Sequence, residues 1–212
     1  ILQIIAIDII LGGDNAIVIA LACKNLPEKQ RKLGIFYGAL GAIILRVIMV
    51  FFATSLLMIS GLKIVGGLLL LWIGVKLILD NGKETSIKVS QEKNLFGAIK
   101  TIIIADFIMS LDNSVAIAAA ADGNIYLVIF GLLLSVPIII WGSSIILKLI
   151  DKYPVIIYLG SGLLGWIAGD MIKTDILTLK YFSASAVQEF LPLAGSFFVI
   201  IYSYLYMKII TR

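Results

Sequence analysis

Two copies of one acidic motif hold the residues of this chain that could do chemistry. The copies read Asp8-Ile-Ile-Leu-Gly-Gly-Asp14-Asn15 and, 98 positions later, Asp106-Phe-Ile-Met-Ser-Leu-Asp112-Asn113. Both lie within apolar stretches that are long enough to cross a membrane. A charged side chain at the centre of a bilayer costs roughly 2.5 to 3.5 kcal/mol on insertion scales, so four carboxylates there need a cation, a proton or a basic partner. We therefore expect the two motifs to form a functional site.

The side chains of the two motifs are hard oxygen ligands. Carboxylate and amide oxygens suit Mn²⁺, Mg²⁺ or Ca²⁺ with six or more ligands, and ligand type alone leaves the choice among these ions open. The chain has no His and one Cys, so it lacks the side chains that usually select zinc, copper or non-haem iron. The predicted metal ligands are Asp8, Asp14, Asn15, Asp106, Asp112 and Asn113.

The composition indicates an integral membrane protein. Of the 212 residues, 61% are hydrophobic and only 14% are charged, and the mean hydropathy is +1.10. Stretches of about 20 apolar residues cross the hydrocarbon core as helices. They occur here at residues 1–22, 34–58, 63–80, 97–121, 125–148, 154–171 and 194–210. The predicted fold class is all-α, a polytopic membrane protein with seven transmembrane helices.

The two halves of the chain are similar in sequence. Residues 8–22 and 106–120 share seven identities in fifteen positions, and residues 71–76 resemble residues 165–170. Because three spans per half is an odd number, duplication inverts the second copy relative to the membrane, as in many secondary transporters. The predicted organisation is a first three-helix repeat at 1–80, a cytoplasmic loop at 81–96, a second, inverted repeat at 97–171, an external loop at 172–193 and a seventh transmembrane helix at 194–212.

The distribution of Lys and Arg predicts the orientation, because short cytoplasmic loops collect these residues. In a seven-span topology, twelve of the seventeen fall on one side: Lys24, Lys29, Arg31, Lys32, Lys83, Lys88, Lys93, Lys100, Lys148, Lys152, Lys208 and Arg212. The other side holds Lys63, Lys173 and Lys180. We therefore expect the N-terminus outside and the C-terminus inside. We interpret the net charge of +4 as a topology signal and not as a surface for nucleic acid.

Helical geometry limits how each motif can build a site. Residues seven apart, such as Asp8 and Asn15, share a helix face, whereas Asp8 and Asp14 point about 120° apart in a regular helix. Gly12-Gly13 is a weak point at which the first helix could unwind and turn Asp14 toward Asp8. A break is less strongly encoded in the second copy, where Ser110-Leu111 takes that place and the Ser110 hydroxyl could serve as a ligand.

Three further charged residues are predicted to support the site. Arg46, near the middle of the second span, is expected to pair with one motif carboxylate and keep it ionised. Four Asp and Arg46 sum to minus three, so a divalent cation and one proton would neutralise the set, which motivates a hypothesis of proton-coupled transport. Lys76 is expected to extend to the membrane interface, and Asp170 is a candidate ligand at the outer gate or exit.

The chain resembles the TerC family of integral membrane proteins, which is named for tellurium resistance and placed with the LysE-like exporters. The resemblance rests on the two motifs, on Leu45-Arg46-Val47, and on the segments 72–76 and 165–170. It implies a manganese exporter in the cytoplasmic membrane of a bacterium, with the acidic metal-binding residues of the family at Asp8, Asp14, Asp106 and Asp112. The metal is then a transported substrate, and no resident cofactor is expected.

Three alternative functions were compared with the sequence. A Ca²⁺/H⁺ exchanger also uses inverted repeats with acidic motifs, but those motifs usually contain Glu, and none of the predicted spans contains Glu. A non-transporting membrane factor that assists metal delivery to exported proteins is a third hypothesis. An intramembrane aspartyl protease needs Gly-x-Gly-Asp and Tyr-Asp, which this chain lacks, so we predict that it is not an enzyme. The expected partners are membrane lipid and a divalent ion, with protons and a second copy of the chain left open.

Overall fold

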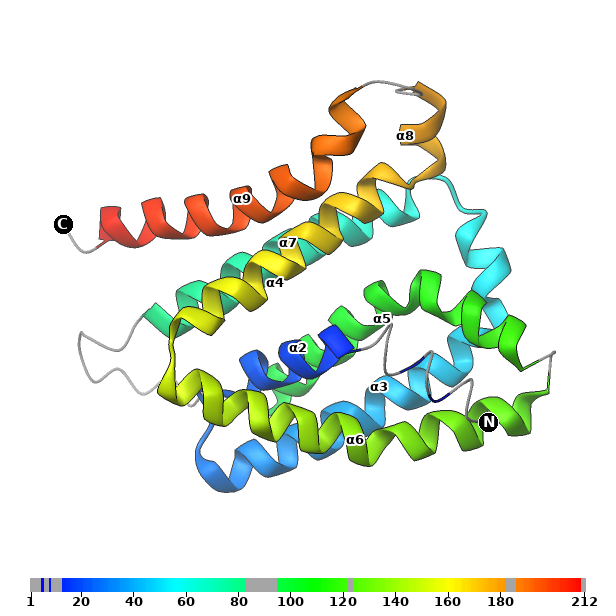
Figure 1. Cartoon of the computed structure of the whole chain (residues 1–212), viewed down its shortest axis with the longest axis horizontal. Helices are drawn as coiled ribbons and strands as arrows, with labels where there is room; N and C mark the ends of the chain where they lie inside the picture. Colours follow the sequence, from blue (N-terminus) through cyan, green and yellow to red (C-terminus); the bar gives the residue numbers. More distant parts are fainter. Residues whose placement is uncertain are drawn as a thin grey trace. The chain divides into compact units, whose positions relative to one another are not determined.

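The computed structural model of the chain describes residues 5, 8, 13–82, 95–121, 124–181 and 186–210. All regular structure within these residues is α-helical, and they contain no strand. The helices are α2 (Gly13–Cys23), α3 (Glu28–Leu57), α4 (Leu62–Gly82), α5 (Leu95–Ala120), α6 (Ile125–Lys152), α7 (Val155–Lys173), α8 (Ile176–Tyr181) and α9 (Ala186–Ile210) (Figure 1). The predicted all-α fold class is confirmed.

Six of the helices in the described part of the chain are long and apolar enough to cross a membrane. The candidate spans are Glu28–Phe52, Leu62–Asp80, Leu95–Ala120, Ile125–Lys152, Val155–Lys173 and Gln188–Lys208. They correspond to the second to seventh predicted spans. The predicted first span, 1–22, includes residues outside the described ones, and α2, its described part, has only 11 residues. The first predicted span, and with it the count of seven, therefore stays a prediction.

Burial in this chain is the reverse of burial in a water-soluble protein. The charged residues Asp8, Arg46 and Asp106 are 1%, 2% and 4% exposed, whereas the apolar side chains of Phe51 and Trp141 are 63% and 70% exposed. A lipid bilayer solvates exposed apolar side chains and penalises exposed charges at its centre. The burial pattern thus agrees with the composition, and it locates the polar residues inside the helical packing.

The helices form two compact units. The first unit contains α2, α3, α5 and α6, with α3 packed along α5. This close packing depends on small residues of α3, because a Cβ atom added at Gly38 would lie 2.5 Å from Cδ1 of Ile102. Small residues are a usual means by which membrane helices approach one another closely.

The helix pairs of the first unit come from both halves of the chain. In the two sequence copies, α2 corresponds to α5 and α3 corresponds to α6. The pair α3 and α5 is thus equivalent to the pair α6 and α2, and both pairs pack together. The unit therefore brings both acidic motifs into one bundle, although they are 98 positions apart. The inverted repeat itself stays a prediction from the sequence.

The second unit contains α4, α7, α8 and α9, and α7 packs against both α4 and α9 (Figure 1). The backbones of α7 and α9 approach very closely. A Cβ atom added at Gly165 would lie 2.4 Å from the carbonyl oxygen of Gly195, and one at Gly169 would lie 2.1 Å from that of Leu191. Small residues spaced four apart are a usual means of close helix packing in membranes.

We expect Gly169→Ala to lower the free energy of unfolding by about 1 to 3 kcal/mol, because the added methyl group meets backbone and cannot be relieved by a side-chain rotation. Thermal unfolding of the purified protein in detergent measures this. Gly142→Ala in α6 is a matched control, since the nearest atom to its added Cβ is 3.8 Å away. Equal stability of the two variants would contradict the close packing of α7 and α9.

The segment 172–193, which the sequence predicted to be an external loop, is largely helical. Helix α7 continues to Lys173, α8 follows, and α9 begins at Ala186 and includes Pro192. Asp175, which is 1% exposed, organises this region. Its carboxylate accepts hydrogen bonds from the backbone N–H groups of Gly61 (3.0 Å), Lys63 (3.1 Å) and Leu177 (2.8 Å). One side chain therefore caps the start of α4 and the start of α8.

Asp175→Ala should lower the free energy of unfolding by about 1 to 3 kcal/mol, because it leaves several backbone donors without their acceptor. Asp175→Asn retains one acceptor oxygen and should lose less. Asp151→Ala provides the comparison, since its ion pair with Arg31 is largely solvent-exposed and such pairs contribute little. If Asp175→Ala and Asp151→Ala had the same free energy of unfolding, the hydrogen bonds to Asp175 would not stabilise the protein.

Candidate cation site in the first helical unit

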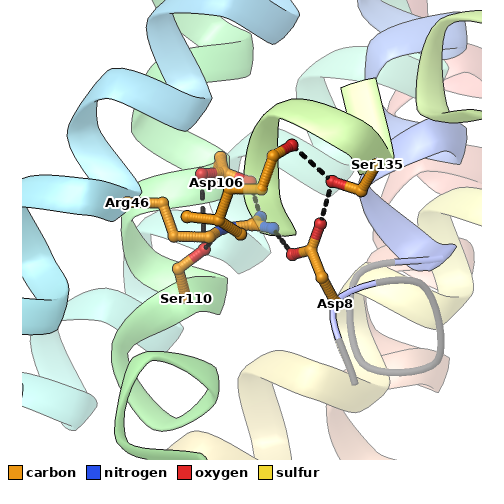
Figure 2. A network of polar contacts seen from close by, with 6 residues as sticks. Asp8, Arg46, Asp106, Ser110 and Ser135 are labelled. Carbon is orange, nitrogen blue, oxygen red and sulfur yellow. Dashed lines mark hydrogen bonds and ion pairs between the residues drawn. The ribbon is translucent and has the colours of Figure 1, made fainter. Parts of the chain in front are cut away.

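Arg46 joins the two copies of the acidic motif. Its guanidinium lies near the middle of α3 and forms ion pairs with Asp8, which precedes α2, through Nη1 and with Asp106 on α5 through Nη2 (Figure 2). Asp8 and Asp106 hold the same position in the two copies. The sequence predicted that Arg46 would pair with one motif carboxylate, whereas the structure pairs it with two.

Two serines complete this network. Ser110 accepts a hydrogen bond from Nε of Arg46 at 3.0 Å and donates one to Oδ2 of Asp106 at 3.3 Å. Ser135 on α6 donates to Oδ2 of Asp8, and its oxygen also lies 2.8 Å from the carbonyl oxygen of Leu132 (Figure 2). Ser135 was not among the predicted site residues. Nothing in the sequence distinguishes its hydroxyl from those of Ser143 and Ser144 in the same span.

Unlike Asp8 and Asp106, the neighbouring Asp14 and Asn15 carry polar atoms without partners. Oδ1 of Asp14 and both amide atoms of Asn15 are buried and form no hydrogen bond within the described residues. Asn15 is 3% exposed and lines a small cavity of about 10 Å³ together with Asp106 and Arg46. The other lining residues are apolar, namely Ile19, Ala39, Ala42, Ile43 and Ile139. A buried amide without partners is destabilising, so it favours a small polar ligand in this cavity.

The local structure of α2 explains how Asp14 and Asn15 are presented. The helix begins at Gly13, so Asp14 lies in its first turn, where the positive end of the helix dipole favours a carboxylate. The charges of Arg46 and Asp106 also act on the Asp14 carboxyl. Residues 9–12 lie outside the described residues, and the predicted break at Gly12-Gly13 stays a prediction.

The second motif copy lies on an unbroken helix. Asp106, Ser110 and Ser114 follow one another at intervals of four along α5, and all three are buried. Asp112, six residues after Asp106, points about 120° away from it in a regular helix and is exposed, while Asn113 is partly buried. The regular helix thus separates the two acidic residues of the second copy in this structure.

The six predicted ligands do not all come together. In the part of the chain that the structure describes, no three acidic, His or Cys side chains lie close enough to hold a metal ion. The guanidinium of Arg46 lies between Asp8 and Asp106. Asp8, Asp106 and Arg46 are buried and Asp14 is partly buried, and together they carry a net charge of minus two. Carboxylate oxygens are ligands that hard divalent cations prefer.

The comparison with known protein families decides the class of this chain. All of it, residues 1–212, matches the integral membrane protein TerC family. The chain belongs to the TerC family. It is 43% identical over 209 residues to the membrane protein YjbE of Bacillus subtilis (strain 168), a match that covers 98% of this chain and 95% of YjbE.

Two further relatives of this TerC protein are more distant. It is 27% identical over 222 residues to the membrane protein YkoY of the same Bacillus strain, covering 96% of this chain and 68% of YkoY. It is 25% identical over 165 residues to the inner membrane protein YgdQ of Escherichia coli (strain K12), covering 70% of this chain and 69% of YgdQ. No solved structure matches the chain. This TerC protein is thus a multi-pass integral membrane protein with bacterial homologues.

The remaining two predicted site residues of this TerC protein belong to the second unit. Lys76 on α4 is partly buried, and its ammonium group lies 5.2 Å from the centre of the Trp72 ring. Asp170 on α7 is exposed. The network around Arg46 draws all of its residues from the first unit, so Lys76 and Asp170 stay predictions for supporting roles.

Proposed function

We propose that this TerC protein is a secondary transporter that exports a divalent metal cation, with Mn²⁺ as the preferred ion. The observation that carries the proposal is that buried oxygens of Asp14 and Asn15 have no hydrogen-bond partner among the described residues, and that Asn15 lines a cavity with Asp106. A cation is the ligand that such oxygens lack, because they can accept but find no donor. The choice of Mn²⁺ and the outward direction rest on the family resemblance.

The proposed site centres on Asp14, Asn15 and Asp106. Asp8 contributes its charge through the shared pair with Arg46. Asp112 and Asn113 are proposed as further ligands from the sequence pattern, and Asp170 as a ligand on the exit path. The proposed setting is the cytoplasmic membrane, with the N-terminus outside and the C-terminus inside.

Proton coupling depends on Asp112. The buried groups alone carry minus two, which one divalent ion neutralises without a proton. If Asp112 joins them during transport, the set carries minus three and takes up one proton as well. We expect a pH gradient to change the Mn²⁺ flux of the natural protein and to have less influence on Asp112→Asn. Equal sensitivity of both proteins would remove Asp112 from the coupling.

Uptake into vesicles tests the proposed function. We would reconstitute the purified full chain and compare the fluxes of Mn²⁺, Ca²⁺ and Mg²⁺ for the natural protein, for Asp14→Asn and for Asp151→Asn, whose carboxylate is on the surface. The proposal predicts Mn²⁺ flux that is lost in Asp14→Asn and retained in Asp151→Asn. Proton-coupled Ca²⁺ flux would favour the exchanger instead. No flux of any ion would favour a factor that assists metal delivery.

A further inference from the structure

Arg46 is a permanent cation inside the candidate site. It is 2% exposed, and each of its three nitrogen atoms donates to a side chain, namely Asp8, Asp106 or Ser110. Asp8 precedes α2, whereas Asp106 and Ser110 lie on α5, and Figure 2 shows these side chains around the guanidinium. A buried cation fixed in this manner acts on any second cation that binds nearby.

The position for a second cation shares a carboxylate with Arg46. Asp106 pairs with Arg46 and also lines the cavity into which Asn15 faces, and Arg46 itself borders that cavity. A divalent ion bound at Asn15 and Asp106 is therefore attracted by three carboxylates and repelled by one guanidinium. Electrostatic interactions are strong in this poorly solvated environment, so the positive charge of Arg46 lowers the affinity of the ion.

We propose that Arg46 is an affinity-determining residue whose charge keeps the transported divalent ion releasable. With Arg46, the buried set has two negative charges, which one divalent ion neutralises. Without it, three carboxylates hold the ion with an excess negative charge, and the ion leaves more slowly. This inference rests on the proposed function, because it concerns the same ion and the same site.

Equilibrium Mn²⁺ binding to the purified full chain, measured by electron paramagnetic resonance, tests the inference. Arg46→Gln should bind Mn²⁺ at least about tenfold more tightly than the natural protein. Its transport rate in vesicles should fall by a similar factor, since release becomes limiting. Arg46→Lys keeps the charge and should shift the affinity much less than Arg46→Gln does.

The double variant Asp8→Asn/Arg46→Gln separates charge from structure. It removes one negative and one positive charge, so its net charge equals that of the natural protein. Its Mn²⁺ affinity should therefore be closer to that of the natural protein than to that of Arg46→Gln. This variant leaves one buried carboxylate, Asp106, without its arginine, whereas Arg46→Gln leaves two, so it carries the test if Arg46→Gln alone does not fold. Thermal unfolding in detergent establishes which variants are folded.

Each result supports or overturns the inference. Folded Arg46→Gln with unchanged or weaker Mn²⁺ binding would overturn it, and so would equal affinities for Arg46→Lys and Arg46→Gln. A double variant whose affinity stays about tenfold or more from the natural value would overturn it too. If the natural protein binds no Mn²⁺, Ca²⁺ or Mg²⁺, the proposed function itself fails, which is a different outcome from natural binding that is insensitive to Arg46.

Discussion

Asp106→Asn is expected to lower Mn²⁺ transport by roughly 100-fold or more, since loss of outer partners alone reduces metal affinity by 10- to 100-fold. Asp106 has three roles in the site. It pairs with Arg46, accepts a hydrogen bond from Ser110 and lines the cavity beside Asn15. The amide keeps the shape of the side chain but removes the charge that attracts the ion. Initial uptake rates in vesicles provide the measurement.

The control for Asp106→Asn is Asp151→Asn, which alters an exposed carboxylate on α6. It should leave transport unchanged, because Asp151 pairs with Arg31 and lies outside the network around Arg46. Size-exclusion chromatography and thermal unfolding identify loss of folding, which the removal of one partner of Arg46 could cause. Folded Asp106→Asn with natural uptake rates would remove Asp106 from the site.

Asn15→Leu is expected to change stability and binding in opposite directions. The buried Asn15 amide has no hydrogen-bond partner within the described residues. An apolar side chain of similar size should therefore stabilise the metal-free protein by about 1 to 3 kcal/mol. The same change removes an oxygen ligand and should weaken Mn²⁺ binding by about 10- to 100-fold. A group retained for packing alone would not show this combination.

Ser161 offers a matched control for Asn15. It is a fully buried side chain on α7 whose hydroxyl also lacks a hydrogen bond among the described residues, and it lies in the second unit. Ser161→Ala should leave Mn²⁺ affinity unchanged. If Asn15→Leu lowers the unfolding temperature and leaves Mn²⁺ affinity at the natural value, the amide is a structural group and the cavity is no binding site.

The sequence predicted the helices and the basic partner well because both follow from local chemistry. Apolar stretches of about 20 residues define membrane helices regardless of their neighbours, and six of the predicted spans correspond to helices of the structure. Arg46 could be identified because an arginine in the middle of an apolar span needs a carboxylate. Only the count of partners was too low, since the sequence cannot show that two acidic segments approach the same face of α3.

The parts that could not be predicted depend on contacts distant in sequence. Asp175 was placed in a loop, and its role appears only when the packing of α4 and α7 brings it to Gly61. Ser135 gains meaning only through Asp8, 127 positions away. Asp112 looked equivalent to Asp14 by alignment. The two differ in exposure, since Asp112 is exposed on the regular helix α5 and Asp14 is partly buried.

Anomalous diffraction from Mn²⁺-bound crystals of the full chain would locate the ion that we propose is transported. We expect one manganese peak in the first unit, within about 2.5 Å of oxygen atoms of Asp106 and Asn15, at the usual distance for hard divalent ions. Manganese bound only by residues of the second unit would contradict the proposed site. So would crystals at saturating Mn²⁺ with no manganese beside Asp106.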